Sequence, residues 1–121
     1  MKKHVLIVDD EVNAREGLAR IIAGKGFDVR TAGDTQEATR LLGESPADVV
    51  ILDLDLPLVP GDSFAAFLRI RYPKTQILFI SGQYDMINPE RFGEQTMYFR
   101  KPIDVDALLE ALESEPERAG R

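Results

Sequence analysis

Three short stretches of this chain are continuously apolar, and they constrain its fold more than any other feature. They cover residues 5–8, 49–52 and 77–80, and they contain only Val, Leu, Ile and Phe. Strands of a parallel sheet are buried on both faces and therefore lack the alternation of polar and apolar side chains. Because each stretch is also far too short to be a transmembrane helix, the three stretches predict central strands of a parallel sheet.

Two further segments, residues 27–31 and 97–100, mix polar and apolar side chains, and we expect them to be edge strands. Apolar residues at helical spacing lie between the expected strands. Asp34 and Asp104 are the expected N-caps of the second and the last of these helices. The apolar positions that mark the helices are Ala14, Leu18, Ile21 and Ile22; Ala38, Leu41 and Leu42; Phe64, Phe67 and Leu68; and Val105, Leu108, Leu109 and Leu112.

This alternation of strands and helices predicts an α/β fold with helices on both faces of a parallel sheet. The flavodoxin-like, doubly wound order 2-1-3-4-5 places the three apolar strands at the centre and the two mixed strands at the edges. In that order the first and third strands are neighbours at the point where the winding reverses. Ligands bind there, at the carboxyl ends of the strands.

Composition and charge narrow the possible function. The 121 residues suffice for one domain, expected over 1–113, with a polar tail or linker over 114–121. The chain has no cysteine, which excludes disulfides and thiolate metal sites and fits a cytoplasmic protein. A net charge of -6 argues against direct nucleic acid binding by this domain. No membrane-length apolar segment or signal-peptide pattern is present, so we expect no membrane association.

Polar side chains follow the predicted carboxyl ends of four strands, and they should meet at one edge of the sheet. Clustered carboxylates repel one another unless a cation joins them, and oxygen ligands suit Mg²⁺. A carboxylate nucleophile, a divalent cation, a hydroxyl and an ammonium are the groups that phosphoryl transfer requires. These residues are Asp9 and Asp10, Asp53 and Asp55, Ser81, and Lys101.

Each of these residues taken alone has a simpler explanation. The aspartates of the first pair could cap the first helix, and those of the second could form a turn before Pro57. Taken alone, Ser81 with Gly82 most often forms a turn, and Lys101 is usually a solvated residue at a strand end. Tyr98 taken alone is more often a core or surface residue. Their convergence on one edge favours a site. His4 precedes the first strand, away from that edge, so we interpret it as a surface residue and not as a phosphorelay histidine.

Four motifs follow one another along nearly the whole chain: VDDE at 8–11 with Arg15, LDLDLP at 52–57 with Gly61, ISG at 80–82, and Tyr98 with KPI at 101–103. Together and in this order, they resemble a response-regulator receiver domain of two-component signalling. The resemblance implies that Asp53 accepts a phosphoryl group from the phosphohistidine of a histidine kinase. It also implies a domain that catalyses only its own phosphorylation and dephosphorylation and is not otherwise an enzyme.

The resemblance implies roles for the surrounding residues as well. Mg²⁺, or Mn²⁺, would be bound by Asp10, by Asp53 and by the backbone carbonyl of Asp55, with Asp9 acting mainly through water. Ser81 would reorient to bond the phosphoryl oxygen, and Lys101 would pair with it; the Lys101–Pro102 bond would be cis. Tyr98 would turn inward together with Ser81. Asp55 and Gln83 would tune how water reaches the acyl phosphate.

The expected partners are a sensor histidine kinase or phosphotransfer protein, and an output domain or target protein. The family's output face comprises the fourth helix, the fifth strand and the fifth helix, and the domain would be a monomer or a phosphorylation-dependent dimer. This chain departs from the pattern near that face. The segment 81–101 is shorter than is usual in the family. Asn88-Pro89-Glu90 within it predicts a fourth helix that is short, late or irregular. Pro60 replaces a frequent aspartate.

Two other interpretations remain. An apolar strand followed by Asp53 and Asp55 also resembles the nucleophile motif of haloacid-dehalogenase-type phosphatases. Against this, the second acid pair, Asp9 and Asp10, lies upstream instead of downstream, the chain is short, and Lys101-Pro102 fits the receiver pattern. The third possibility is a pseudo-receiver, an interaction module that is never phosphorylated. It is disfavoured because none of the five acceptor-site positions is missing.

Overall fold

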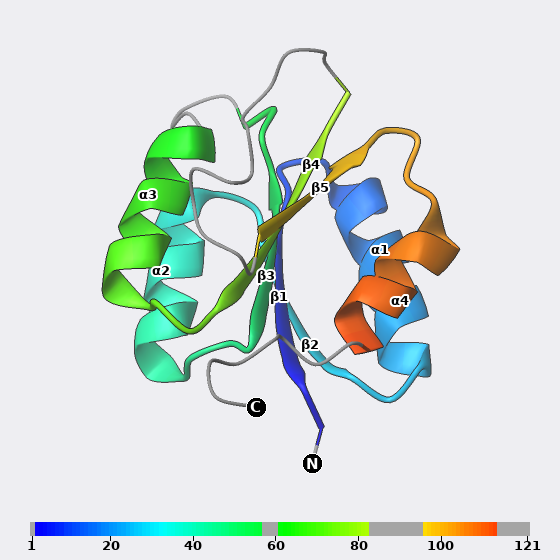
Figure 1. The fold of residues 1–121 in the computed structure, drawn as a ribbon, viewed down its shortest axis with the longest axis horizontal. Helices are drawn as coiled ribbons and strands as arrows, with labels where there is room; N and C mark the ends of the chain where they lie inside the picture. Colours follow the sequence, from blue (N-terminus) through cyan, green and yellow to red (C-terminus); the bar gives the residue numbers. More distant parts are fainter. Residues whose placement is uncertain (1, 57–60, 83–95, 114–121) are drawn as a thin grey trace, which may run out of the picture.

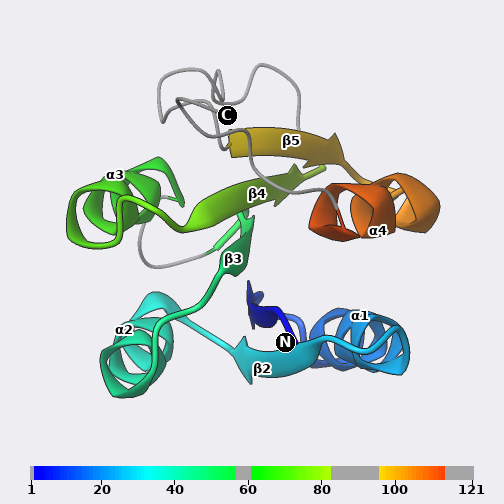
Figure 2. The ribbon, with the colours of Figure 1, turned by 60° about the horizontal axis from the view of Figure 1, so that its bottom comes forward.

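The computed structural model describes residues 2–56, 61–82 and 96–113. They form one five-stranded sheet with the order β2-β1-β3-β4-β5, in which all neighbouring strands are parallel. Figure 2 shows β2 and β5 at opposite edges of the sheet. The predicted flavodoxin-like order is therefore confirmed, as are the central and edge positions of the strands. The strands are β1 (His4–Val8), β2 (Asp28–Ala32), β3 (Val49–Asp53), β4 (Gln76–Ser81) and β5 (Thr96–Arg100).

Four helices in the described residues cover the two faces of the sheet. Figure 1 shows α1 and α4 on one face and α2 and α3 on the other. This is the three-layer arrangement expected for a doubly wound sheet. No helix among the described residues has the length and apolar character needed to cross a bilayer. The helices are α1 (Val12–Gly24), α2 (Thr35–Glu44), α3 (Gly61–Arg71) and α4 (Val105–Glu113).

Some sequence predictions fall outside the described residues. They are the short or irregular helix expected between β4 and β5, which would include Asn88, Pro89 and Glu90; the loop with Pro57 and Pro60; and the polar tail, 114–121.

The two faces of the central strands build two separate halves of the core. Every residue of β3 and β4 is buried, which explains why their sequences show no polar alternation. Full burial of a large aliphatic side chain contributes about 1.5–3 kcal/mol. The strand residues that face α2 and α3 include Leu6, Val8, Val50, Leu52 and Phe79, and those that face α1 and α4 include Val5, Ile7, Ile51 and Leu78.

The predicted N-caps of α2 and α4 are confirmed. The Asp34 carboxylate accepts a hydrogen bond of 2.7 Å from the backbone N–H of Glu37. The Asp104 carboxylate accepts one of 3.1 Å from the backbone N–H of Ala107. Such bonds satisfy N–H groups that have no partner within the helix.

The apolar positions that were predicted to share one face of α1 are not all buried. Ile22 is fully buried, but Ile21 is 43% exposed, and Ala14 is also exposed. Successive residues of an α-helix point about 100° apart, since one turn takes 3.6 residues. When Ile22 faces the sheet, Ile21 must therefore point toward its flank. The sequence contains two adjacent isoleucines, and only packing against the sheet distinguishes them.

Candidate functional site

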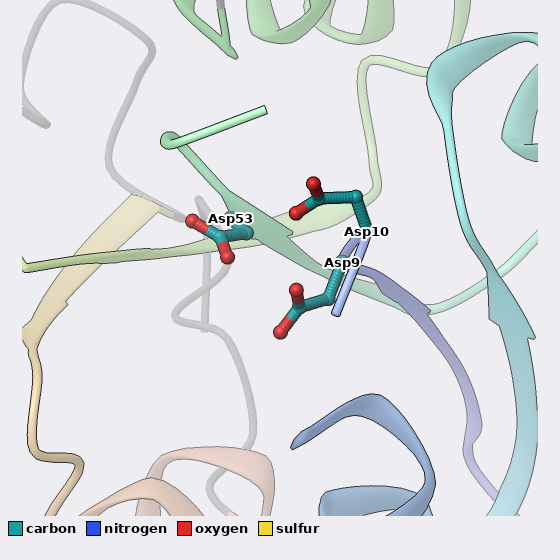
Figure 3. A group of neighbouring side chains, drawn as sticks. All are labelled: Asp9, Asp10 and Asp53. Atoms are coloured by element: carbon teal, nitrogen blue, oxygen red, sulfur yellow. The ribbon is translucent and has the colours of Figure 1, made fainter. Parts of the chain in front are cut away.

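The parallel register of β1 and β3 brings three aspartates together. Val8 pairs with Leu52, so the next residues along the chain, Asp9 just after β1 and Asp53 at the end of β3, reach the same edge of the sheet. Each aspartate, Asp10 included, has a carboxylate oxygen within 4.8 Å of one from each of the others. Figure 3 shows the three side chains gathered where β1 and β3 end. Asp53 is buried and Asp10 is exposed, so the three carboxylates extend from the protein interior to the surface.

The simpler explanation of Asp9 and Asp10 as helix caps is wrong. Glu11 is the N-cap of α1, and its carboxylate accepts hydrogen bonds from the backbone N–H groups of Asn13 and Ala14, at 3.3 and 2.6 Å. Because Glu11 already caps the helix, capping does not explain why two acidic residues precede it.

Crowding and burial change the protonation of Asp9. Burial of its carboxyl raises the pKa of Asp9 from the ordinary 3.8 to about 6, and the nearby Asp53 carboxylate adds to this rise. A hydrogen bond of 2.9 Å from the backbone N–H of Glu11 opposes it. Full ionisation of these carboxylates is therefore unfavourable without a neutralising partner. This is the condition under which a bound cation is favourable.

An apolar cavity contributes to this burial. A partly enclosed space of about 280 Å³ lies beside Asp9, Asp53 and Lys101. Its walls are mostly aliphatic, among them Leu18 of α1 and Ile103. These aliphatic walls offer the Asp9 carboxyl few hydrogen-bond partners on this side, which disfavours its charged form.

Lys101 supplies the opposing positive charge. Its ammonium donates a hydrogen bond of 2.9 Å to Oδ2 of Asp53. Partial burial lowers the pKa of Lys101, but the hydrogen bond and charge of Asp53, with the charges of Asp9 and Asp55, outweigh it and raise the pKa overall. Lys101 therefore carries its positive charge at neutral pH.

Two neighbouring hydrogen bonds hold Lys101 and Asp53 in these positions. The backbone N–H of Lys101 donates to the carbonyl of Ser81 at 2.8 Å, which places the start of the loop after β5 beside the end of β4. The Lys101–Pro102 peptide bond is cis. The other oxygen of the acceptor candidate, Oδ1 of Asp53, accepts a bond of 2.8 Å from the backbone N–H of Asp55.

The Asp55 side chain makes contacts that the sequence analysis did not anticipate. Its Oδ1 accepts a hydrogen bond of 3.0 Å from the hydroxyl of Ser81, and its Oδ2 accepts one of 3.1 Å from the backbone N–H of Gly82. The same Oδ2 lies 3.6 Å from the ammonium of Lys101. β3 ends at Asp53, and Asp55 lies in the turn that follows, so strand alternation does not predict where its side chain points.

The structure thus brings six of the sequence-predicted residues together, while Tyr98 lies elsewhere, on β5. Tyr98 is partly buried on β5 and packs against the half of the core that faces α2 and α3. Gln83 lies outside the described residues. The predicted surface position of His4 is confirmed, and its imidazole lies 3.3 Å from the Asp28 carboxylate. The six assembled residues are Asp9, Asp10, Asp53, Asp55, Ser81 and Lys101.

The arrangement can be compared with known families. The family model described as "Response regulator receiver domain" matches residues 5–113. This chain belongs to the response-regulator receiver family. The receiver family is a family of signalling domains, so membership also decides against the haloacid-dehalogenase-type phosphatase.

Relatives and solved structures agree with this assignment. A Rickettsia bellii protein named as an NtrX-like response regulator is 33% identical over 110 residues, which are 87% of this chain and 23% of that protein. The structure of the Vibrio cholerae chemotaxis protein CheY4 matches with a TM-score of 0.80 and 28% identity, over 93% of this chain and 98% of that one. NtrX of Brucella abortus matches with a TM-score of 0.82 and 26% identity, over 93% of this receiver and 26% of that chain. This chain therefore spans about a quarter of the length of both NtrX-type relatives.

Proposed function

We propose that this receiver domain is a phosphorylatable switch of a two-component system and that Asp53 is its phosphoacceptor. The observation that carries the proposal is the position of the Asp53 carboxylate, buried between the acid pair Asp9–Asp10 and the ammonium of Lys101. The donor would be the phosphohistidine of a sensor histidine kinase or of a phosphotransfer protein. The domain itself spans 1–113, and residues 114–121 serve as a tail or linker.

The contacts of Asp53 suit it for attack on phosphorus. One oxygen is held by the backbone N–H of Asp55 and the other by Lys101, so the carboxylate has a defined orientation. In the reaction an oxygen of Asp53 forms the new O–P bond while the N–P bond of the phosphohistidine breaks. The imidazole leaves with the electron pair of the broken bond. The Lys101 ammonium is placed to balance charge on the phosphoryl oxygens.

The acid group fits a divalent cation. The donor atoms are carboxylate oxygens only, which is the set preferred by Mg²⁺ and also accepted by Mn²⁺. We assign Asp10 and Asp53 as direct ligands, Asp9 as acting mainly through water, and the backbone carbonyl of Asp55 as a further ligand. A bound cation would neutralise phosphoryl oxygens and relieve the repulsion among the carboxylates.

Phosphorylation would act by population shift. Contacts of Ser81 and Lys101 with a phosphoryl group exist mainly in one of two conformations, so the modification favours that conformation. Tyr98 would report the change to β5, α4 and the segment 83–95, the proposed output face. An output domain or target protein would bind there, in the cytoplasm and without direct nucleic acid contacts by this domain. The receiver would be a monomer or a phosphorylation-dependent dimer.

Asp53→Asn tests the phosphoacceptor directly. The wild type, incubated with a small acyl-phosphate donor and Mg²⁺, should gain the mass of one phosphoryl group, and the adduct should be acid-labile. Asp53→Asn should gain none, because its amide is not a nucleophile. Asp106→Asn, an exposed aspartate in the first turn of α4, is the matched control and should label like the wild type.

Other outcomes would refute the assignment. Label that persists in Asp53→Asn would place the phosphoryl group elsewhere. A wild type that is never labelled, with or without Mg²⁺, would favour the pseudo-receiver. Catalytic turnover of generic phosphomonoesters would favour a phosphatase.

A further inference from the structure

The Asp55 carboxylate accepts two hydrogen bonds and forms an ion pair with a nearby ammonium. The Ser81 hydroxyl is 3.0 Å from Oδ1, and the Gly82 backbone N–H is 3.1 Å from Oδ2. The Lys101 ammonium is 3.6 Å from Oδ2. A hydroxyl, a backbone N–H and an ammonium together make a typical environment for an oxyanion. The carboxylate of Asp55 is the oxyanion that fills it in this structure.

Two of these groups, the Ser81 hydroxyl and the Lys101 ammonium, are the ones that the proposed function assigns to a phosphoryl group on Asp53. Lys101 already contacts both carboxylates, since it donates to Oδ2 of Asp53 at 2.9 Å. A serine hydroxyl carries one hydrogen and donates one hydrogen bond at a time. Ser81 therefore cannot donate to Asp55 and to a phosphoryl oxygen simultaneously. One of the two anions must give up this bond.

We propose that Asp55 is a built-in competitor of the phosphoryl group, a latch that holds Ser81, Gly82 and Lys101 in the unphosphorylated state. The proposal rests on Asp53 being the phosphoacceptor and adds how the site is regulated. Phosphorylation replaces one anion by another: the phosphoryl oxygens take the donors, and the Asp55 carboxylate turns out toward solvent. Its partial exposure permits this movement, because 28% of the side chain is already accessible.

The latch also gives the Asp55 side chain a role before any phosphate is present. While it is bound to Ser81 and Gly82, it is not available to direct water toward an acyl phosphate. An influence on phosphate lifetime requires that the latch open first. Asp55 is thus a positioning residue that acts through Ser81.

Binding of beryllofluoride with Mg²⁺ to the full chain tests the competition, because this ion mimics a phosphoryl group. Asp55→Asn keeps the size of the side chain and loses its charge, so it should bind the mimic roughly tenfold more tightly, a typical coupling between two sites. A mere loss of negative charge could produce the same gain, so the test needs a double-mutant cycle with Ser81→Ala. A latch acting through Ser81 requires the gain to shrink in the Ser81→Ala background. An equal gain in both backgrounds would overturn it.

A second measurement uses the protein without Mg²⁺ or mimic and does not depend on Asp53 chemistry. The amide resonance of Gly82 should move on Asp55→Asn and on Asp55→Ala, because the N–H loses its charged acceptor. Asp48→Asn, at the opposite ends of the strands, is the control and should leave it in place. An unmoved Gly82 resonance in both Asp55 variants would overturn the latch even if Asp53 is phosphorylated. Conversely, a moved resonance without labelling of Asp53 would refute only the proposed function.

Discussion

At the scale of single residues, Lys101 determines how charge is shared in the site. Its ammonium lies 2.9 Å from Asp53 and 3.6 Å from Asp55, so it links the proposed phosphoacceptor to the proposed latch. It reaches the site from the end of β5, whereas both aspartates come from β3 and the residues just after it. We therefore expect a change at this residue to affect both the proposed phosphoryl transfer and its coupling to the proposed output face.

Lys101→Ala should separate labelling from switching. Asp53 should still be labelled, roughly 10²-fold more slowly because a donor to the phosphoryl oxygens is lost. The chemical-shift change at Tyr98 on phosphorylation should disappear, since Lys101 no longer joins β5 to the phosphoryl group. NMR of labelled and unlabelled samples measures this, with Lys74→Ala, an exposed lysine, as the control. An unchanged Tyr98 response in Lys101→Ala would contradict the coupling.

Asp9 predicts a dependence of stability on pH. Its pKa is raised from 3.8 to about 6 in the folded state, first of all by burial. A raised carboxyl pKa means that folding favours the protonated form. The contribution of Asp9 to the free energy of unfolding is fully present below the pKa of this carboxyl in the unfolded chain. It is lost as the pH rises through about 6.

Asp9→Asn should therefore stabilise the cation-free protein at about pH 7.5. Because the carboxyl is only half buried, we expect on the order of 1 kcal/mol, a rise in Tm of a few degrees. Thermal unfolding in a chelator measures this, and the advantage should vanish below about pH 4, where Asp9 is protonated in both states. Added Mg²⁺ should stabilise the wild type more than the variant. If Asp9→Asn were less stable than the wild type in chelator, the ionised Asp9 carboxylate would not be destabilising the folded state.

At the scale of elements, each helix is held by a stripe that faces the sheet. In α1 this stripe includes Ile22, which is fully buried, while its neighbour Ile21 is 43% exposed. The difference arises from helix geometry and not from residue type, so the two isoleucines form a matched pair.

Ile22→Ala should destabilise the fold by about 2–5 kcal/mol, the usual cost of truncating a buried Ile side chain. Ile21→Ala should cost less than about 1 kcal/mol, since much of its side chain is already hydrated. Urea unfolding of both variants measures the difference. Similar losses for the two would mean that the orientation of α1 on the sheet is wrong.

At the scale of the whole molecule, the site exists because parallel strands end at one edge. Its residues lie far apart in the sequence, from Asp9 to Lys101, and four strands deliver them to a single place. The sheet order makes β1 and β3 neighbours, which joins Asp9 and Asp10 to Asp53. The pairing of β3 with β4 and of β4 with β5 adds Ser81 and Lys101. A change of strand order would disperse the site without altering any of its residues.

Much of this organisation could be predicted from local patterns. Continuous apolar runs indicate strands buried on both faces, and mixed segments such as 27–31 indicate edges. Residues that follow such strands must collect at one edge, because parallel strands all point the same way. The positions of Asp9, Asp10, Asp53, Ser81 and Lys101 at this edge follow from these facts alone. So do the N-caps Asp34 and Asp104, since capping depends only on residues a few positions away.

Other features depended on contacts that only tertiary packing creates. The exposure of Ile21 depends on how α1 is rotated against the sheet, and Glu11 caps the helix where two earlier acids could equally have done so. The bonds from Ser81 and Gly82 to Asp55 join the end of β4 to the turn after β3, and their lengths are set by register and by side-chain rotamers. Periodicity specifies which elements form and which way they point. Distances of about 3 Å between side chains depend on the packing of every element, and these distances pair Lys101 with Asp53 and Ser81 with Asp55.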